Sequence, residues 1–292
     1  MMILLFLLFL GISALLFKFI TADGDFTLMS KKHVKRDEIE DKVVWITGAS
    51  RGIGEILAKQ LANLGAKLIL SARNEAELER VKAQLTGKHA PNEVQILPLD
   101  LASGEDSLRQ AVEKAESFFA RSGVDIMIHN AAFERPKSTA LDVTEESLQA
   151  TFDVNVFGTL SLTRLLAPFM LRRGRGQFVV LCQKGIKVTV VCPGPIETSN
   201  GSGATTSTKR SSSEKRVSSE RCAELTIIAA SHGLKEAWIS YQPVLAVMYL
   251  VQYMPTMGYF LMDKIGGNRL EAAAKKGNTY SLGLIFGKRK AT

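Results

Sequence analysis

The sequence predicts an α/β fold built on a doubly wound parallel sheet, and three observations support this. Short apolar runs rich in β-branched residues alternate along the chain with segments of helical spacing. These runs are apolar almost throughout, as expected of strands covered on both faces. A glycine-rich turn directly follows the first run. The expected strands are residues 43–47, 67–71, 94–97, 125–129, 177–181 and 187–192.

The helices expected around these strands follow from apolar spacing and capping residues. Asn74 is expected to cap a charged helix that ends near Leu85. Thr144, followed by two glutamates, is expected to open a long helix that ends near Arg172. The chain has 292 residues, of which 46% are hydrophobic, and this suffices for one large core. The remaining expected helices are residues 54–64, 105–121 and 223–230.

Residues 1–20 are almost uninterrupted apolar residues, which is the length that a bilayer requires. A cleaved signal peptide would begin with basic residues and end at a small-residue cleavage site. The start of this segment carries no charged side chain, and Thr21-Ala22-Asp23 is a poor cleavage site. We therefore expect a retained membrane signal anchor.

Basic residues at both ends of the chain bear on its orientation. The cluster 31–36 (KKHVKR) directly follows the expected anchor, so the positive-inside rule predicts a cytosolic body. The chain ends Lys288-Arg289-Lys290-Ala291-Thr292, which resembles a lysine-based signal for retrieval to the endoplasmic reticulum. A solvated basic tail is an equally good interpretation. The expected location is the endoplasmic reticulum membrane, with the body in the cytosol.

The overall charge narrows the classes of partner. A net charge of +8 and a sequence pI near 9.4 suit a phosphorylated ligand or an anionic membrane surface. Nucleic acid is not an expected partner, because no basic stripe is interleaved with aromatic residues. No metal site is expected either, since Cys182, Cys192 and Cys222 form no CxxC pair.

Two later segments depart from the strand–helix alternation. Residues 199–219 consist mainly of Ser, Thr, Gly, Lys and Arg, which predicts a flexible loop. Residues 243–262 are strongly apolar, but Gln252 and Pro255 interrupt them. They could form a membrane-embedded hairpin, an interfacial helix or the lid of an apolar pocket, and the interruptions favour the last two. We assign residues 220–292 to a segment associated with substrate and membrane.

The glycine-rich turn is Thr47-Gly48-Ala49-Ser50-Arg51-Gly52-Ile53-Gly54, between an expected strand and an expected helix. In this setting the first glycine permits a tight turn, the second lets the backbone approach a pyrophosphate, and the third lets the helix pack on the strand. The helix N-terminus offers unpaired N–H groups to the phosphates. The turn therefore predicts a dinucleotide site.

The end of the second expected strand favours NADP(H) over NAD(H). NAD-binding folds place an acidic residue there, which bonds the ribose 2′-hydroxyl. Here the strand ends Ser71-Ala72-Arg73, without an acid. Arg73, and Arg51 in the glycine-rich turn, can instead pair with a 2′-phosphate.

In these motifs the sequence resembles the short-chain dehydrogenase/reductase family, over about residues 40–240. The family pattern T-G-x-x-x-G-x-G is matched by residues 47–54. Further landmarks occur in the family's order: Leu99-Asp100-Leu101, His129-Asn130-Ala131-Ala132, Asn155-Val156-Phe157-Gly158 and Pro193-Gly194-Pro195-Ile196-Glu197-Thr198. The second of these matches the family's N-N-A-G segment with two substitutions, His129 for the first asparagine and Ala132 for the glycine.

The resemblance implies a role for each landmark in a Rossmann domain over residues 40–198. Asp100 and Leu101 would contact the adenine ring, and Asn130 and Ala131 would line the cofactor. Asn155 would help to anchor the proton relay. Pro193 and Gly194 would line the nicotinamide, with Thr198 near its carboxamide or a phosphate. The apolar ends resemble the membrane-bound branch, which implies a lipophilic alcohol or carbonyl substrate such as a steroid or retinoid.

The family's chemistry also needs a serine after strand five and a Tyr-x-x-x-Lys pair on the next helix, and neither is present. All five tyrosines lie at Tyr241 or later, and none has a lysine four residues further on. Only residues 182–186 separate the two expected strands. The simplest hypothesis is an internal deletion near residues 181–187, from alternative splicing or a gene-prediction artefact. Asn155 then remains as the only relay residue.

Three expectations follow from this gap. Parallel neighbours are usually joined by a dozen residues or more, so strand 187–192 should not pair in parallel with strand 177–181. Residues 193–198 should then move away from the nicotinamide. The missing helix would supply much of the usual dimer interface, so a homodimer is not favoured. We expect an NADP(H)-dependent oxidoreductase with impaired catalysis; the alternatives are a non-catalytic, membrane-tethered NADP(H)-binding protein and an unstable splice product.

Overall fold

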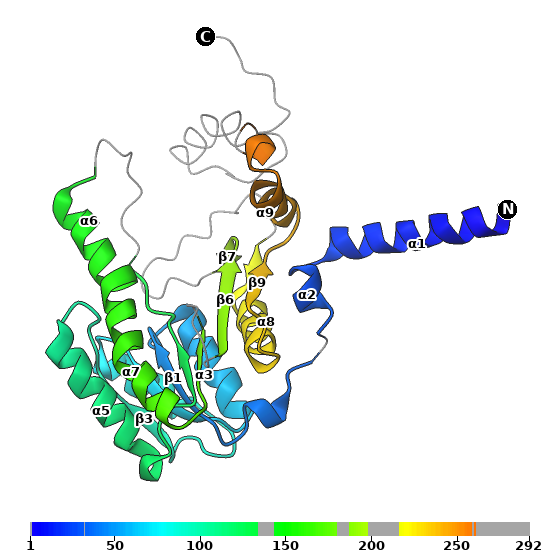
Figure 1. Cartoon of the computed structure of the whole chain (residues 1–292). Helices are drawn as coiled ribbons and strands as arrows, with labels where there is room; N and C mark the ends of the chain where they lie inside the picture. The colour runs from blue at the N-terminus through cyan, green and yellow to red at the C-terminus, as the bar shows by residue number, and fades with distance from the viewer. Residues whose placement is uncertain are drawn as a thin grey trace, which may run out of the picture.

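Seven parallel strands in the order β3-β2-β1-β4-β5-β6-β9 form the centre of the molecule in a computed structural model (Figure 1). The structure describes residues 2–31, 33–133, 143–179, 187–197, 216–258 and 260. The doubly wound parallel fold is thus confirmed. The strands of this sheet are β1 (Val43–Thr47), β2 (Lys67–Ser71), β3 (Val94–Ile96), β4 (Ile126–Ile128), β5 (Gln177–Val179), β6 (Lys187–Pro193) and β9 (Glu236–Ile239).

Helices cover both faces of the sheet, and β1 shows why. All five of its residues are buried, and alternate side chains enter different core clusters. Val44 and Ile46 pack with α3 (Gly52–Asn63), α4 (Glu75–Ala83) and α8 (Ser219–Ser231). Trp45 packs on the other face with α5 (Glu105–Arg121) and α7 (Thr159–Arg172). Burial on both faces is what the uninterrupted apolar runs indicate.

The capping residues act as expected. The Asn74 side chain accepts a hydrogen bond from the Glu77 N–H, 3.3 Å away, and Thr144 accepts one from the Ser147 N–H, 3.2 Å away. The helix that Thr144 opens runs as α6 (Glu145–Phe152), a π-helical turn (Asp153–Gly158) and α7. The π-helical turn, which contains Asn155, was not predicted from the sequence.

Two apolar helices bear on the membrane question. Among the described residues, Glu145–Arg172 is the helix found to be long and apolar enough to cross a membrane. Its α7 part packs on the sheet through Leu162 and Leu166, both 0% exposed, so it serves as a core helix. The N-terminal helix α1 (Met2–Thr21) instead projects from the body (Figure 1). Its large apolar side chains from Leu5 to Phe17 are exposed, as a membrane-seeking helix requires.

The position of β6 corrects one expectation. β6 pairs in parallel with β5, with Gln177 opposite Lys187 and Val179 opposite Thr189. The expectation was wrong because only three residues of each strand are paired. The chain therefore has to cover only about 10 Å between the end of β5 and the start of β6. The seven residues between Val179 and Lys187 can span roughly 25 Å when extended. Those connecting residues, 180–186, lie outside the described residues.

The far edge of the sheet differs most from the sequence-based expectation. β9 was not anticipated, although its residues Ala237 to Ile239 are buried. The expected loop 199–219 ends earlier than predicted, because Val217–Ser218 forms strand β8 beside β7 (Ile196–Glu197). Val217 is 0% exposed, and burial of this one apolar side chain accounts for the difference. Residues 199–215 of that loop lie outside the described part of the chain.

Candidate functional site

The carboxyl ends of β1 and β4 meet at one edge of the sheet, and Thr47 joins them. Its buried hydroxyl donates to the Ile128 carbonyl at 3.3 Å and accepts from the N–H groups of Asn130 and Ala131, both at 3.2 Å. The Asn130 amide then donates to the carbonyls of Thr47 and Gly48, both at 3.1 Å. The segment after β4 therefore braces the glycine-rich turn, and the structure brings these two predicted motifs together.

The three glycines of the turn have different surroundings. A Cβ on Gly54 would overlap the Gly48 carbonyl oxygen, and a Cβ on Gly48 would lie 2.8 Å from the Ala131 Cα. Gly48 and Gly54 are therefore required by packing within the turn. Gly52 has a φ of +59° but nothing within 4 Å of its would-be Cβ. The turn is thus tight on its inner side and open at Gly52, where the sequence predicts the pyrophosphate.

Helix α3 begins at this open side. Its N-cap residue, Arg51, makes no side-chain capping bond, so the first N–H groups of the helix remain available to a ligand. An anion here is stabilised by these donors and by the positive end of the helix dipole. The open position at Gly52 and this uncapped helix start both fit the phosphates of a dinucleotide.

Arg80 on α4 contacts the outer side of the glycine-rich turn, a role that was not predicted from the sequence. Its guanidinium donates to the Ser50 carbonyl at 3.0 Å and pairs with Glu55 on α3 at 2.9 Å. Its hydrogen bond with Glu55 raises the pKa of Arg80 and lowers the pKa of Glu55, so the pair stays charged. Glu77, three residues before Arg80, contributes a second carboxylate. That spacing was the only signal available in the sequence.

The residues that are expected to select the cofactor lie at the same edge. Arg73 follows β2 and is exposed, as is Arg51. Within the described chain, neither guanidinium is found in an ion pair. Ser71, the last residue of β2, is buried, and its hydroxyl accepts from the Trp45 indole N–H at 2.8 Å. Two exposed cations, with no acid among residues 71–73 at the end of β2, suit a ligand that carries an additional phosphate.

Asp100 and Leu101 follow β3. One Asp100 carboxylate oxygen accepts from the Ala102 N–H at 3.0 Å, which shapes the turn, and the residue is half-buried. Leu101 is buried, and its carbonyl oxygen would be overlapped by a Cβ on Gly158. The structure therefore packs the predicted adenine-side turn against the end of the Asn155 motif.

Asn155 does not reach the cofactor turn directly. Its side-chain oxygen accepts from the Phe133 N–H at 2.7 Å, and its amide donates to the Phe133 carbonyl at 3.0 Å. Asn155 lies in the π-helical turn, which leaves backbone groups locally unpaired and occurs often at functional sites. The residue thus fixes the chain that continues from the Asn130 segment.

Pro193 and Gly194 end β6 at the same edge as Thr47, since all strands of the sheet are parallel. The Gly194 N–H donates to the Ile239 carbonyl at 2.9 Å, and a Cβ on Gly194 would lie 2.5 Å from the Ser240 hydroxyl oxygen. Contrary to our expectation, this motif has not left the edge that carries the dinucleotide turn. Its predicted last member, Thr198, lies outside the described residues.

His129 replaces the first asparagine of the family motif and is half-buried beneath the site. Its Nε2 lies 2.9 Å from the Thr163 hydroxyl, and its ring stacks on Phe178 at 6.0 Å. Its Nδ1 is buried without a hydrogen-bond partner among the described residues. Burial lowers the pKa of His129 to about 4, so the imidazole is neutral at physiological pH.

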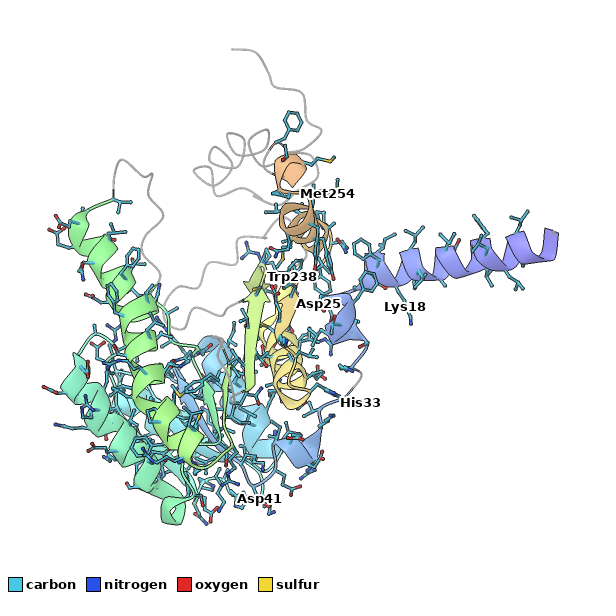
Figure 2. All side chains as sticks on the ribbon, viewed as in Figure 1. Lys18, Asp25, His33, Asp41, Trp238 and Met254 are labelled. Atoms are coloured by element: carbon cyan, nitrogen blue, oxygen red, sulfur yellow. The ribbon has the colours of Figure 1, made fainter. Side chains whose placement is uncertain are left out.

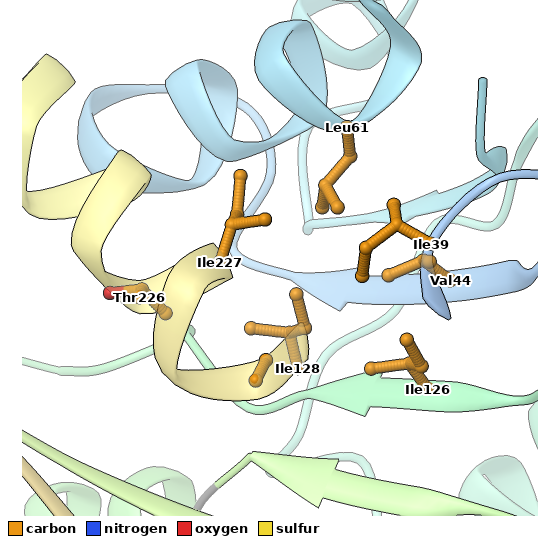
Figure 3. A pocket seen from close by; sticks show the side chains of 8 residues that line it. Ile39, Val44, Leu61, Ile126, Ile128, Thr226 and Ile227 are labelled. Atoms are coloured by element: carbon orange, nitrogen blue, oxygen red, sulfur yellow. The ribbon is translucent and has the colours of Figure 1, made fainter. Parts of the chain in front are cut away.

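Two further features lie away from this edge. A small apolar pocket (Figure 3) is enclosed by α3, α8 and the sheet, and the one hydroxyl on it, of Thr226, donates to the Cys222 carbonyl at 2.8 Å. This pocket belongs to the core. Across the described ranges, no group of three or more metal-binding side chains was found. Of the three described tyrosines, Tyr249 and Tyr253 lie on α9 (Val244–Tyr253), in contact with one another and with Trp238. The third, Tyr241, follows β9 at the carboxyl edge of the sheet and packs on the core cluster beside α8.

Fold and site together define a dinucleotide-binding α/β protein of the doubly wound class. Residues 42–183 match the family model described as short chain dehydrogenase. Dehydrogenase/reductase SDR family member 7 of Homo sapiens is 34% identical, over 88% of this chain and 88% of the relative. The chain therefore belongs to the short-chain dehydrogenase/reductase family of oxidoreductases.

Other similar proteins agree with this assignment. A Drosophila melanogaster protein, Dehydrogenase/reductase SDR family protein 7-like, is 28% identical over 82% of this chain and 85% of its own. 11-beta-hydroxysteroid dehydrogenase A of Sesamum indicum is 36% identical, over 50% of this chain and 40% of its own. A solved metagenomic short-chain oxidoreductase in complex with NADP matches with a TM-score of 0.52 at 19% identity, covering 66% of this chain and 92% of that one. The structural match shows the shared fold.

Proposed function

We propose that this protein is a membrane-anchored NADP(H)-binding member of the family that binds its cofactor but has little oxidoreductase activity. One contrast carries the proposal: Asn130 and Thr47 brace a complete dinucleotide turn, whereas every tyrosine in the chain lies at residue 241 or later. Loss of a positioned acid/base lowers a rate by about 10²–10⁴. The intact family reaction, on a lipophilic alcohol or carbonyl, is the activity from which this chain derives.

The chain's own residues supply the binding chemistry. Gly52 leaves room for the pyrophosphate, and the N–H groups at the start of α3 hold it. Arg51 and Arg73 are placed to pair with a 2′-phosphate, and Asp100 with Leu101 borders the adenine side. A bound nicotinamide dinucleotide would supply hydride-transfer chemistry. The proton that must accompany the hydride has no Tyr-x-x-x-Lys pair to supply it: Tyr241, which follows β9 at this edge, packs on the core cluster beside α8 and has Leu245 four residues further on.

The comparisons support an internal loss of residues. The alignment with the human relative extends over 301 positions, more than the 292 residues of this chain, although it uses only 88% of them. Tens of positions in that relative therefore have no counterpart here. The match to the family model ends at residue 183, within the segment where the sequence analysis places the deletion. The lost helix is also the reason for proposing that the family's usual homodimer is weakened.

The proposed substrate class and location rest on the ends of the chain. The name of the Sesamum relative specifies a hydroxysteroid, which is consistent with a lipophilic ligand for this branch. Helix α1 has the length and exposed apolar surface of a membrane anchor. The basic residues after it favour a body in the cytosol, at the endoplasmic reticulum. Asn200-Gly201-Ser202 is a glycosylation sequon, and a gel shift on deglycosylation would contradict that orientation.

Cofactor choice gives the direct test of the binding proposal. NADPH and NADH are titrated calorimetrically into the full chain, with Arg73→Glu as the test variant and Lys114→Glu, an exposed charge reversal on α5, as the control. We expect wild type and Lys114→Glu to prefer NADPH by roughly 10–100-fold, the value of one charged hydrogen bond to phosphate. Arg73→Glu should lose that preference. Equal or tighter NADH binding by the wild type would refute the assignment.

A further inference from the structure

The C-terminal end of helix α1 lies against helix α9, although more than 200 residues separate them in sequence. The Phe19 ring, near the end of α1, stacks on Phe26 of α2 (Phe26–Met29) at 5.6 Å and lies 6.3 Å from Tyr249 of α9. The Tyr249 ring in turn lies 4.8 Å from Trp238 of β9 and 6.1 Å from Tyr253. Four elements thus share one aromatic cluster. Trp and Tyr are the residues that concentrate at membrane–water interfaces.

Hydrogen bonds hold this arrangement to the body. The buried Asp25 carboxylate accepts from the N–H groups of Leu28 at 2.9 Å and Trp238 at 2.6 Å. The Gln242 amide donates to the Phe19 carbonyl at 3.1 Å, and the Phe26 N–H donates to the Tyr249 hydroxyl at 3.2 Å. Figure 2 shows Asp25 and Trp238 together where α1 leaves the body. The start of α9 is therefore held close to the place where the expected anchor enters a bilayer.

The far end of α9 exposes apolar side chains. A helical turn after Pro255 folds back on α9, because the Gly258 N–H donates to the Met254 carbonyl at 2.9 Å and a Cβ on Gly258 would lie 2.7 Å from the Val251 Cα. This arrangement turns four large side chains outward. We call them the α9 tip: Tyr253, Met254, Met257 and Phe260, which are 73%, 50%, 56% and 70% exposed. Met254 is labelled on this helix in Figure 2.

The charge pattern around the tip points to a lipid surface. Residues 237–262 contain no Asp, Glu, Lys or Arg, so the tip can enter an apolar medium without burying a charge. The first charged residues that follow that run are Asp263, Lys264 and Arg269, and the basic residues Lys31 and Lys35 follow α1. Cations that flank an apolar surface are attracted to anionic lipid headgroups, each by about 1 kcal/mol.

We propose that the α9 tip rests in the headgroup and acyl boundary of the bilayer that α1 spans, as a second membrane contact. This inference rests on the proposed anchoring by α1. The contact also orients the site: a Cβ on Gly194 would meet Ser240 and lie 3.5 Å from Val244, the first residue of α9. The edge of the sheet that carries the dinucleotide turn therefore adjoins the membrane-facing helix. A lipophilic ligand would enter that edge laterally from the bilayer.

Brominated lipids test this contact in the full chain. Met257→Trp places a reporter on the tip, and Phe157→Trp places one on the π-helical turn between α6 and α7 at matched exposure, since Met257 is 56% and Phe157 54% exposed. Each variant is bound to phosphatidylcholine–phosphatidylserine vesicles with or without brominated acyl chains. The tryptophan fluorescence of the wild type is subtracted from that of each variant. The fractional quenching of the added tryptophan is then compared between the two variants. A ring buried about 5–10 Å into the boundary contacts the brominated chains, so we expect at least roughly two-fold greater fractional quenching for Met257→Trp.

Flotation of the same samples separates this inference from the anchor. If the chain floats with the vesicles and the two added tryptophans are quenched equally, the tip does not contact lipid, while α1 remains an anchor. This result would favour the alternative in which the apolar segment is a pocket lid. If the chain does not float, the anchor and the tip contact are both refuted.

Discussion

Gly52 and Gly54 lie two residues apart, but a methyl group would meet very different surroundings at the two positions. At Gly54 it would overlap the Gly48 carbonyl oxygen, whereas at Gly52 there is nothing within 4 Å. Packing of the turn therefore explains why residue 54 is a glycine, but it does not explain Gly52. The φ of +59° itself favours glycine at position 52, and the open space there fits the proposed role, in which a dinucleotide approaches the backbone.

The variant Gly52→Ala distinguishes a role of Gly52 in the stability of the turn from a role in ligand binding. Its φ of +59° is strained for alanine, so we expect a loss of about 1 kcal/mol in the free energy of unfolding. NADPH affinity should fall by about ten-fold or more, because a methyl group would occupy the pyrophosphate approach. Gly174→Ala is the matched control, with a φ of +65° and equally open surroundings at the end of α7. An equal affinity in both variants, measured by calorimetry, would contradict this role of Gly52.

His129 makes the stability of the fold depend on pH. Burial lowers its pKa from 6.5 to about 4, so below pH 6.5 the unfolded chain takes up a proton that the folded chain does not. Stability is therefore full above pH 6.5 and declines as the pH falls toward 4. Below pH 4 both states are protonated, and the loss stops. A shift of this size corresponds to about 3 kcal/mol.

His129→Asn removes this titration and restores the asparagine of the family motif. Urea unfolding of the variant between pH 7 and pH 4 should show a decline about 3 kcal/mol smaller than that of the wild type. His33→Asn, which removes an exposed histidine, should retain the wild-type decline. If the wild type and His129→Asn lose stability in parallel, the imidazole is not held neutral by burial.

At the scale of elements, Arg80 couples α4 to the start of α3 and to the glycine-rich turn. In Arg80→Met the Ser50 carbonyl and Glu55 lose this partner, which should reduce NADPH affinity several-fold. The stability cost should stay near 1 kcal/mol, because the Arg80 side chain is 39% exposed and the ion pair is screened. Arg109→Met breaks the exposed Glu105 pair on α5 and should leave affinity unchanged. An unchanged affinity in Arg80→Met would show that the turn holds its shape without it.

Strands β5 and β6 show where reasoning from the sequence fails at this scale. From the usual crossover length we predicted that β6 could not pair in parallel with β5. Because only three residues of each strand are paired, a short connection is sufficient. β9 was missed because Glu236–Ile239 is a four-residue strand, and only its position at the edge of the sheet defines it as one. The long helix from Thr144 was foreseen because its cap and apolar spacing are local signals. Strand order and pairing are not local, and the sequence contains them only indirectly.

At the scale of the whole molecule, the nucleotide edge could be largely predicted from the sequence. Thr47, Gly48 and Gly54 act within a local strand–turn–helix motif, so spacing alone is sufficient to locate them. The hydrogen bonds from Asn130 to the Gly48 carbonyl and from Arg80 to the Ser50 carbonyl could not be located in this way. They join segments that lie about 80 and 30 residues apart in the sequence, respectively. The contact between α1 and α9 is of the same kind. Nothing in either apolar segment indicates that Phe19 and Tyr249 share a cluster.

The most direct test of the whole account measures binding and turnover on one sample. NADPH is titrated into the vesicle-bound full chain, and a steroid or retinoid carbonyl is then added while nicotinamide absorbance is followed. The human relative, Dehydrogenase/reductase SDR family member 7, is assayed in parallel as the reference. The account predicts saturable NADPH binding with a turnover rate about 10²–10⁴ below that of the relative. Turnover at a rate comparable to the relative's, or an absence of NADPH binding, would contradict it.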